Sequence, residues 1–135
     1  MDIFTALHSH ITASSNVTSL SSNRVYPMVA PINAKKPYVT LHQISNVPTH
    51  AMVNDANIHM YRMQISSWTS AFTQIVSLST AIKDKLRDVS GTIGSSNFVV
   101  QRIFFDTEYD FPEINPETNK IVYQRAQDYL IWTTG

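Results

Sequence analysis

The chain has 135 residues, the usual size of one domain, and we expect residues 1–135 to form a single domain. Ten basic and ten acidic residues cancel to a net charge of zero, so the chain lacks the positive surplus that tight binding to nucleic-acid phosphates requires. Cysteine is absent, which excludes disulfides, thiolate nucleophiles and sulfur-ligated metals.

The first part of the chain predicts one helix and then a connection. Within residues 2–13, apolar side chains recur at every fourth position and form a single stripe, made of Ile3, Leu7 and Ile11. Residues 14–23 are rich in Ser, Thr and Asn, and we interpret them as a connection between elements. A brief strand over residues 24–27 follows and ends at Pro27.

Two longer strands are predicted next, over residues 37–45 and 58–68, with a polar loop between them. The second strand alternates apolar and polar side chains, as expected for a sheet that is covered on one side. Its apolar face consists of Tyr61, Met63 and Ile65, and its polar face of Arg62, Gln64 and Ser66.

A long helix over residues 70–88 is indicated by apolar residues at helical spacing and by basic residues in its last turns, with Gly91 as its expected stop. Residues 97–105 resemble a strand that is buried on much of both faces. A loop of residues 106–120 then leads into a terminal strand, 123–132, and a last strand often lies at the edge of a sheet.

These elements predict an α+β fold: a single, largely antiparallel sheet of about four to five strands with two helices packed on one face. The strand ending at Trp68, the long helix and the strand starting at Phe98 could instead form a parallel crossover. The sequence leaves this pairing open.

Motifs for catalysis are missing from the sequence. The three glycines, at positions 91, 94 and 135, cannot build a phosphate-binding loop or a dinucleotide fingerprint. The five histidines form no HExxH pair. No segment is apolar enough to span a membrane, and the N-terminus does not resemble a secretory signal. We therefore expect no catalytic residues, no cofactor, no metal ligands and no membrane partner.

The loop of residues 106–120 holds half of the acidic residues of the chain, interleaved with apolar ones. Candidate interaction residues in it are Asp106, Glu108, Tyr109, Asp110, Phe111, Glu113, Ile114 and Glu117. One hypothesis is a solvated hairpin loop, and another is an interaction arm whose apolar groups a partner covers. A third is a site for metal-assisted hydrolysis, although Phe111 occupies the place where a calcium loop with this spacing needs glycine.

Four segments, in this order, resemble one known family. They are Arg24-Val-Tyr-Pro27, Pro37-Tyr-Val39, the strand Tyr61–Ile65 ending in Trp68 before a helix, and Tyr123-Gln-Arg125 followed by Asp128-Tyr129 and Ile131-Trp132. Together they are similar to the tail-completion, or tail-to-head joining, proteins of long-tailed bacteriophages, a tail-terminator-like group.

The resemblance implies a virion protein that assembles in the bacterial cytoplasm into a ring, commonly a homohexamer. Such a ring caps the head-proximal end of the tail tube, ends tube polymerisation and contacts the head connector, while DNA passes through the lumen without specific binding. It implies no catalytic residues. The aromatic residues in the shared segments are expected to pack in the core and on the sheet, namely Tyr26, Tyr38, Trp68, Tyr129 and Trp132.

The sequence also leaves alternatives to this function open. A head-completion or neck protein would form a similar ring on the portal side, and a small metal-dependent hydrolase would use the acidic loop. In a closed ring each subunit needs two different patches, which an edge strand and a protruding loop could provide. The acidic loop could instead line the lumen and repel DNA.

Overall fold

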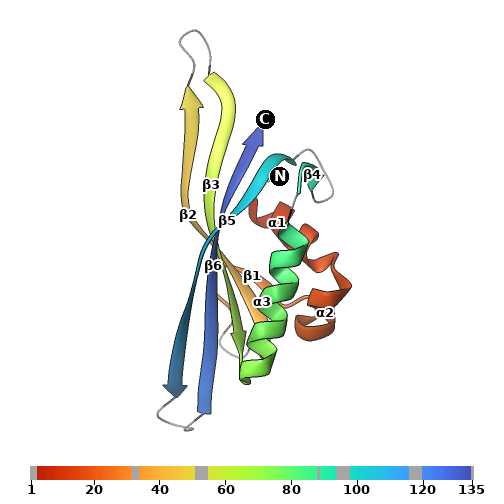
Figure 1. The fold of residues 1–135 in the computed structure, drawn as a ribbon, viewed down its shortest axis with the longest axis vertical. Helices are drawn as coiled ribbons and strands as arrows, with labels where there is room; N and C mark the ends of the chain where they lie inside the picture. The colour runs from red at the N-terminus through yellow and green to blue at the C-terminus, as the bar shows by residue number, and fades with distance from the viewer. Residues whose placement is uncertain are drawn as a thin grey trace.

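The computed structural model describes residues 3–31, 34–50, 55–87, 89–93, 98–115 and 120–134. Within them the chain forms three helices and a six-stranded sheet (Figure 1). In chain order the elements are α1 (Ile3–Thr12), α2 (Ser15–Ser21), β1 (Val25–Pro27), β2 (Tyr38–His50), β3 (Asp55–Thr69), α3 (Phe72–Leu86), β4 (Gly91–Ile93), β5 (Phe98–Asn115) and β6 (Lys120–Thr134). The α+β class is as predicted, and the elements exceed the expected two helices and four to five strands.

The sheet has the strand order β1-β2-β3-β6-β5-β4, and every neighbouring pair except β1 with β2 is antiparallel. The terminal strand β6 lies between β3 and β5, so the expectation that it forms a sheet edge is wrong. Because β3 and β5 both run antiparallel to β6, they are parallel to each other. α3 therefore connects two parallel strands as a crossover, with β6 inserted between them.

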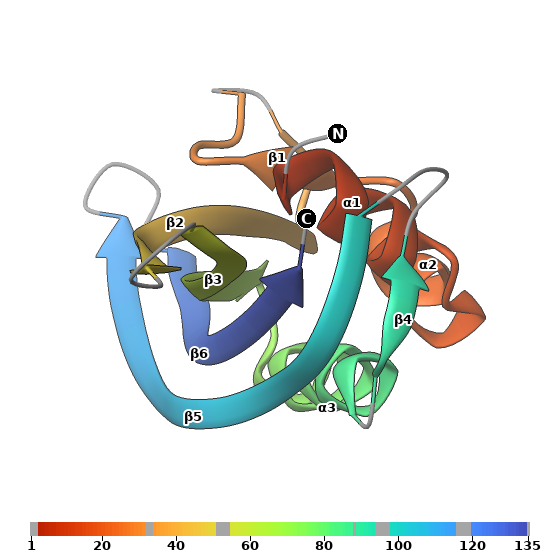
Figure 2. The same ribbon diagram turned by 90° about the horizontal axis from the view of Figure 1, so that it is seen from above.

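Two hairpins extend from the curled sheet in opposite directions (Figures 1 and 2). β2 and β3 stay paired as far as His50 and Asp55, beyond the last residues at which β3 pairs with β6. At the other end, β5 and β6 stay paired as far as Asn115 and Lys120, beyond the end of β3. Each hairpin thus has an end that the rest of the sheet does not flank.

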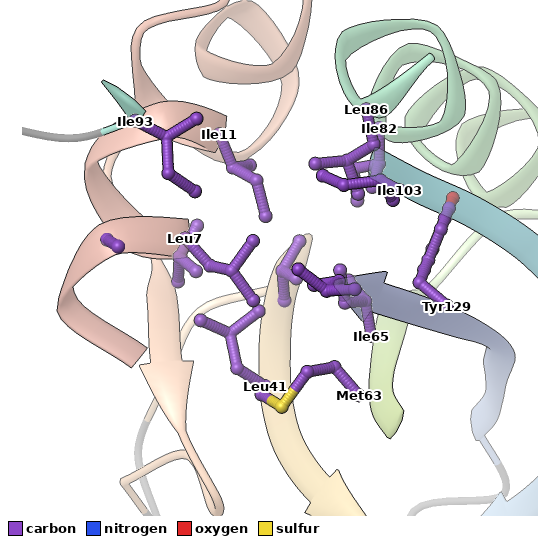
Figure 3. Packing of buried hydrophobic residues seen from close by; sticks show 14 of the residues in the cluster. Leu7, Ile11, Leu41, Met63, Ile65, Ile82, Leu86, Ile93, Ile103 and Tyr129 are labelled. Carbon is purple, nitrogen blue, oxygen red and sulfur yellow. The ribbon is translucent and has the colours of Figure 1, made fainter. Parts of the chain in front are cut away.

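The hydrophobic core lies between the helices and one face of the sheet (Figures 1 and 3). The predicted stripe of α1 is buried, and α3 contributes a second stripe at helical spacing, made of Leu78, Ile82 and Leu86. From the sheet, Leu41, Met63, Ile65 and Ile131 face these helices with at most 1% of their surface exposed. Each such side chain contributes about 1.5–3 kcal/mol through burial.

Residues 14–23, predicted to be a connection, contain α2 instead. Two apolar residues anchor this helix in the core, the buried Val17 and the partly buried Leu20. The hydroxyls of Thr18 and Ser21 donate to carbonyls four residues earlier, at 3.2 Å each, and so satisfy their own hydrogen-bonding needs inside the helix. The polar composition of residues 14–23 concealed this helix, because two apolar residues one turn apart are too few to show a helical period.

The loop predicted between residues 45 and 58 and the loop of residues 106–120 are largely strand. Residues 97–105 were expected to be buried on both faces, yet Phe104 and Phe105 are 47% and 43% exposed. α3 ends at Leu86, and Gly91 does not stop it but begins the short strand β4 at a φ of 96°, a conformation that favours glycine. The two predicted loops share a cause: the ends of the hairpins project beyond the core, so their sequence shows little strand-like alternation.

His10, near the end of α1, joins this helix to the last turn of α3. Its Nε2 lies 3.2 Å from the Lys85 carbonyl oxygen, and because a carbonyl only accepts, Nε2 carries the proton and donates it. Burial lowers the pKa of His10 below its ordinary 6.5, and the hydrogen bond to Lys85 opposes this shift only partly.

We expect this lowered pKa to make stability depend on pH. Above pH 6.5 His10 is neutral in both the folded and the unfolded chain. As the pH falls from 6.5 towards the folded-state pKa, the unfolded chain takes up the proton first, so the free energy of unfolding decreases. Urea unfolding at a series of pH values gives the free energy of unfolding at each pH. In this window it should change less with pH in His10→Gln than in the wild type. The same dependence of the free energy of unfolding on pH in His10→Gln and in the wild type would contradict the prediction.

Candidate functional site

The candidate site is the arm formed by residues 106–115 of β5 and 120–128 of β6, which we call the β5–β6 arm. It contains every predicted interaction residue except Glu117, which lies outside the described residues. The arm continues past the end of β3, where Thr69 pairs with Tyr123, and past the start of α3 (Figure 1). The acidic segment is therefore the outer strand of a hairpin arm over residues 106–115, and not a loop.

Three acidic side chains of the arm form ion pairs with basic residues of the same subunit. Asp106 pairs with Arg62 of β3, Glu108 lies 3.7 Å from Lys83 of α3, and Asp110 lies 2.8 Å from Arg125 of β6. The hydrogen bond from Arg125 to Asp110 raises the pKa of this guanidinium further. Three of the five acidic residues of the cluster are thus paired within the subunit.

A β-bulge distributes these acids over both faces of the arm. Phe105 pairs with Tyr129 and Thr107 with Asp128, so Asp106 is an extra residue in β5. After the bulge, Glu108 faces the helices, whereas Asp106 contacts Arg62 on the opposite face. Without the extra residue, the alternation of the strand would place both carboxylates on one face.

On the face away from the helices, a polar network ties the arm to β3. The Gln64 amide donates to the Tyr109 hydroxyl, which donates to the Asp128 carboxylate at 3.4 Å. Arg62 lies 3.8 Å from the same carboxylate. Burial, followed by the charge of Asp128, raises the pKa of Tyr109, so its hydroxyl stays protonated and can donate. Tyr109 therefore serves first to hold β5 against β3 and β6 in the curled sheet.

On the face towards the helices, the fully buried Gln127 fastens the arm to α3. Its amide nitrogen donates to the Ser79 carbonyl at 3.3 Å and to the Glu108 carboxylate at 2.9 Å. The Tyr129 hydroxyl donates to its amide oxygen at 3.2 Å. Lys83 completes this group, because its ammonium lies over the Phe105 ring at 4.4 Å from the centroid. Gln127 is not among the predicted site residues, because a lone glutamine in a strand carries no signal.

The end of the arm and the start of α3 expose apolar side chains. Phe111 is 47%, Ile114 66% and Ile121 43% exposed, and Phe72 at the first turn of α3 is 59% exposed. A cavity of about 180 Å³ lies between α3 and the arm, lined among others by Phe72, Ile75, Pro112 and Tyr123. Of these exposed residues, Phe111 and Ile114 were predicted site residues, whereas Ile121 and Phe72 were not.

The described residues provide no grouping of three or more His, Asp or Glu side chains placed to hold a metal ion. Asp106, Glu108 and Asp110, the described members of the calcium-like spacing, point towards different cations on two faces of a strand. Across the described parts of the chain, no helix combines the length and the hydropathy that a membrane span needs.

Comparison with known proteins identifies the family. The model of the family described as Tail completion protein gp17 matches residues 5–128. The chain belongs to this family. No curated protein matches it. Among solved structures, a chain from the virion of a native gene transfer agent particle has a similar fold, with a TM-score of 0.76 at 16% identity, covering 98% of this chain and 95% of that chain.

Membership of the tail completion family makes the chain a structural virion protein of the tail. It confirms the resemblance found in the sequence, and the matched range includes three of the four segments in full. The fourth segment extends past the match, because Tyr129, Ile131 and Trp132 lie beyond residue 128.

The structure brings the first three of these segments together on the face away from the helices. The Arg24 guanidinium donates to the Pro37 carbonyl at 3.0 Å, and the rings of Tyr26 and Tyr38 meet edge to face with centroids 6.0 Å apart. Tyr38 stacks on Trp68 at 5.9 Å. These aromatic residues pack on the sheet, as the resemblance implied, and Tyr129 lies in the core.

We expect Gln127→Leu to destabilise the subunit, although leucine has a similar volume. The substitution leaves the buried Tyr129 hydroxyl and the Ser79 carbonyl without this partner, at a cost of about 1–3 kcal/mol for each group that stays unsatisfied. Gln124→Leu is the matched control, because Gln124 lies on the same strand, is only half buried and donates a single 3.3 Å hydrogen bond to Ser66. Urea unfolding followed by circular dichroism measures both, and an equal loss in the two variants would contradict the assigned role of Gln127.

Proposed function

We propose that this protein is the subunit of a closed homohexameric ring at the head-proximal end of a phage tail tube. The ring ends polymerisation of the tube protein and joins the tail to the head connector, and DNA passes through its lumen without specific binding. Its role is structural and needs no catalytic residue or cofactor. Membership of the tail completion family supports this proposal, and the net charge of zero is consistent with DNA passing without being bound.

The observation that carries the proposal is the end of the β5–β6 arm, which exposes apolar side chains away from the core. Phe111, Ile114 and Ile121 would each gain by being covered. Ile114 and Ile121 oppose each other on the face of the arm that also bears Phe72, and Phe111 lies on the other face, so a partner protein that encloses the end of the arm can bury both faces. We propose this end as the contact with a neighbouring virion protein.

The charged residues of the arm have a different task in this proposal. Asp106, Glu108 and Asp110 hold the arm in place through their ion pairs, so we assign contact with the partner to the apolar end of the arm. Glu113 and Glu117 remain proposed contact residues on the basis of the sequence. Neutralisation of three carboxylates also weakens the alternative in which the acidic segment lines the lumen and repels DNA.

Shortening the arm tests this assignment. Residues 113–115 and 120–122 lie beyond the level at which β6 pairs with β3. Replacing residues 113–122 by Asn-Gly should therefore close a two-residue hairpin after Pro112 and leave the core intact. We expect circular dichroism and thermal unfolding close to the wild type, and loss of joining between purified tails and heads. Normal joining by the shortened subunit would refute the arm as the contact.

The matched control is a substitution at an exposed apolar residue outside the arm, Val29→Ser, since Val29 is 78% exposed beside β1. It should leave joining unchanged. Native mass spectrometry of the wild type tests the ring directly, and a protein that stays monomeric in the presence of tail tubes would refute the ring. Pull-down with tail-tube protein and with portal-side proteins separates the proposed role from that of a head-completion ring, which would bind only the portal side.

A further inference from the structure

Both edges of the sheet contain a stretch of strand that is paired on one side only. Among the described residues, β4 pairs with β5 only from Phe98 to Val100, so Arg102–Asn115 pairs with β6 alone. At the other edge, β1 pairs with β2 only up to Leu41, so His42–His50 pairs with β3 alone. Such stretches carry backbone N–H and C=O groups to which a further strand can bind.

Parts of these two stretches lie at the same level of the sheet. Through the registers of β3 and β6, Arg102 is level with Val47 and Thr107 is level with His42. The strands β2, β3, β6 and β5 alternate in direction, so β5 runs opposite to β2. When copies stand side by side around an axis along the strands, residues 102–107 of one copy therefore meet residues 42–47 of the next copy in antiparallel orientation.

The two segments that lie at the same level, residues 102–107 and 42–47, also match in length and in irregularity. Each contains one bulge, Asp106 in β5 and Ile44 in β2, so equal numbers of residues span equal heights. Each exposes apolar side chains: Phe104 and Phe105 are 47% and 43% exposed, and Ile44 and Val47 are 48% and 51% exposed. Burying these groups between two copies would add apolar contact to the backbone hydrogen bonds.

We propose that residues 102–107 of β5 pair with residues 42–47 of β2 in a second copy of this chain, which makes the sheet continuous from one subunit to the next. The contact is heterologous, because each copy offers its β5 edge to one neighbour and its β2 edge to the other, and such contacts can close a ring. Pro48, which directly follows residues 42–47 and lacks a backbone donor, limits the pairing at that end. This inference rests on the proposed ring and names the contact that closes it.

Disulfide cross-linking tests the pairing cleanly, because the chain has no cysteine of its own. Phe104 is level with Ser45, and Arg102 with Val47, so the double variants F104C/S45C and R102C/V47C place cysteines opposite each other across the contact. After mild oxidation of assembled rings, we expect a ladder of covalent oligomers on a non-reducing gel that ends at the copy number of the ring. The control F104C/V76C moves one cysteine to an exposed position on α3 and should give no ladder.

Mixing the single variants F104C and S45C should give covalent dimers and nothing larger, since each copy then carries one cysteine. Cross-linking of F104C with itself would indicate a two-fold contact and would overturn the inference. Wild-type rings with no ladder from either double variant would overturn it too, while leaving the proposed ring intact. If the wild type forms no ring, the proposed function itself fails. Should a double variant fail to assemble, the mixed single variants decide the outcome.

Discussion

Pairing of the last strand on both of its edges is the constraint on which the rest of this structure depends. β6 pairs with β5 over almost its full length and with β3 from Ile58 to Thr69. Because β6 holds the centre, the sheet ends on one side in β5 and on the other in β2, apart from the short strands β1 and β4. The offset between β3 and β6 leaves each hairpin with an unflanked end (Figure 1). The two arms and the two free edges thus follow from the position of one strand.

Two neighbouring polar residues of β6 then decide how the β5–β6 arm is held. Alternation along the strand sends Gln127 towards the helices and Asp128 to the opposite face. Gln127 donates hydrogen bonds to Ser79 and Glu108. Asp128 accepts a hydrogen bond from Tyr109 and forms an ion pair with Arg62. Buried polar groups are costly unless their hydrogen bonds are complete, so each network stabilises one arrangement of the arm over others that would leave a partner unsatisfied.

The sequence predicted the elements that border the core and failed for those that do not. Met63 and Ile65 of β3 and the apolar stripe of α3 show the expected periods, because one face of each is covered. The ends of the two hairpins project beyond the core, and α2 is anchored by only Val17 and Leu20, so neither shows a clear period. The acids of the arm looked like a solvated patch because their partners are distant in the sequence: Arg62 is 44 residues from Asp106, and Arg125 is 15 residues from Asp110. The central place of β6 depends on pairing with strands far away in the chain, which no local pattern encodes.

Neutralisation of the arm within each subunit bears on how identical copies can approach one another. If Asp106, Glu108 and Asp110 were unpaired, every copy would present the same negative arm, and copies crowded around one axis would repel one another within the screening length of about 8 Å at physiological salt. Ion pairing inside the subunit offsets these three charges before assembly begins. Association then depends on apolar side chains and on strand edges, and in a free subunit both of these promote aggregation. The bulges and Pro112 limit that hazard, because an edge with an irregular register accepts only a strand that carries a matching irregularity.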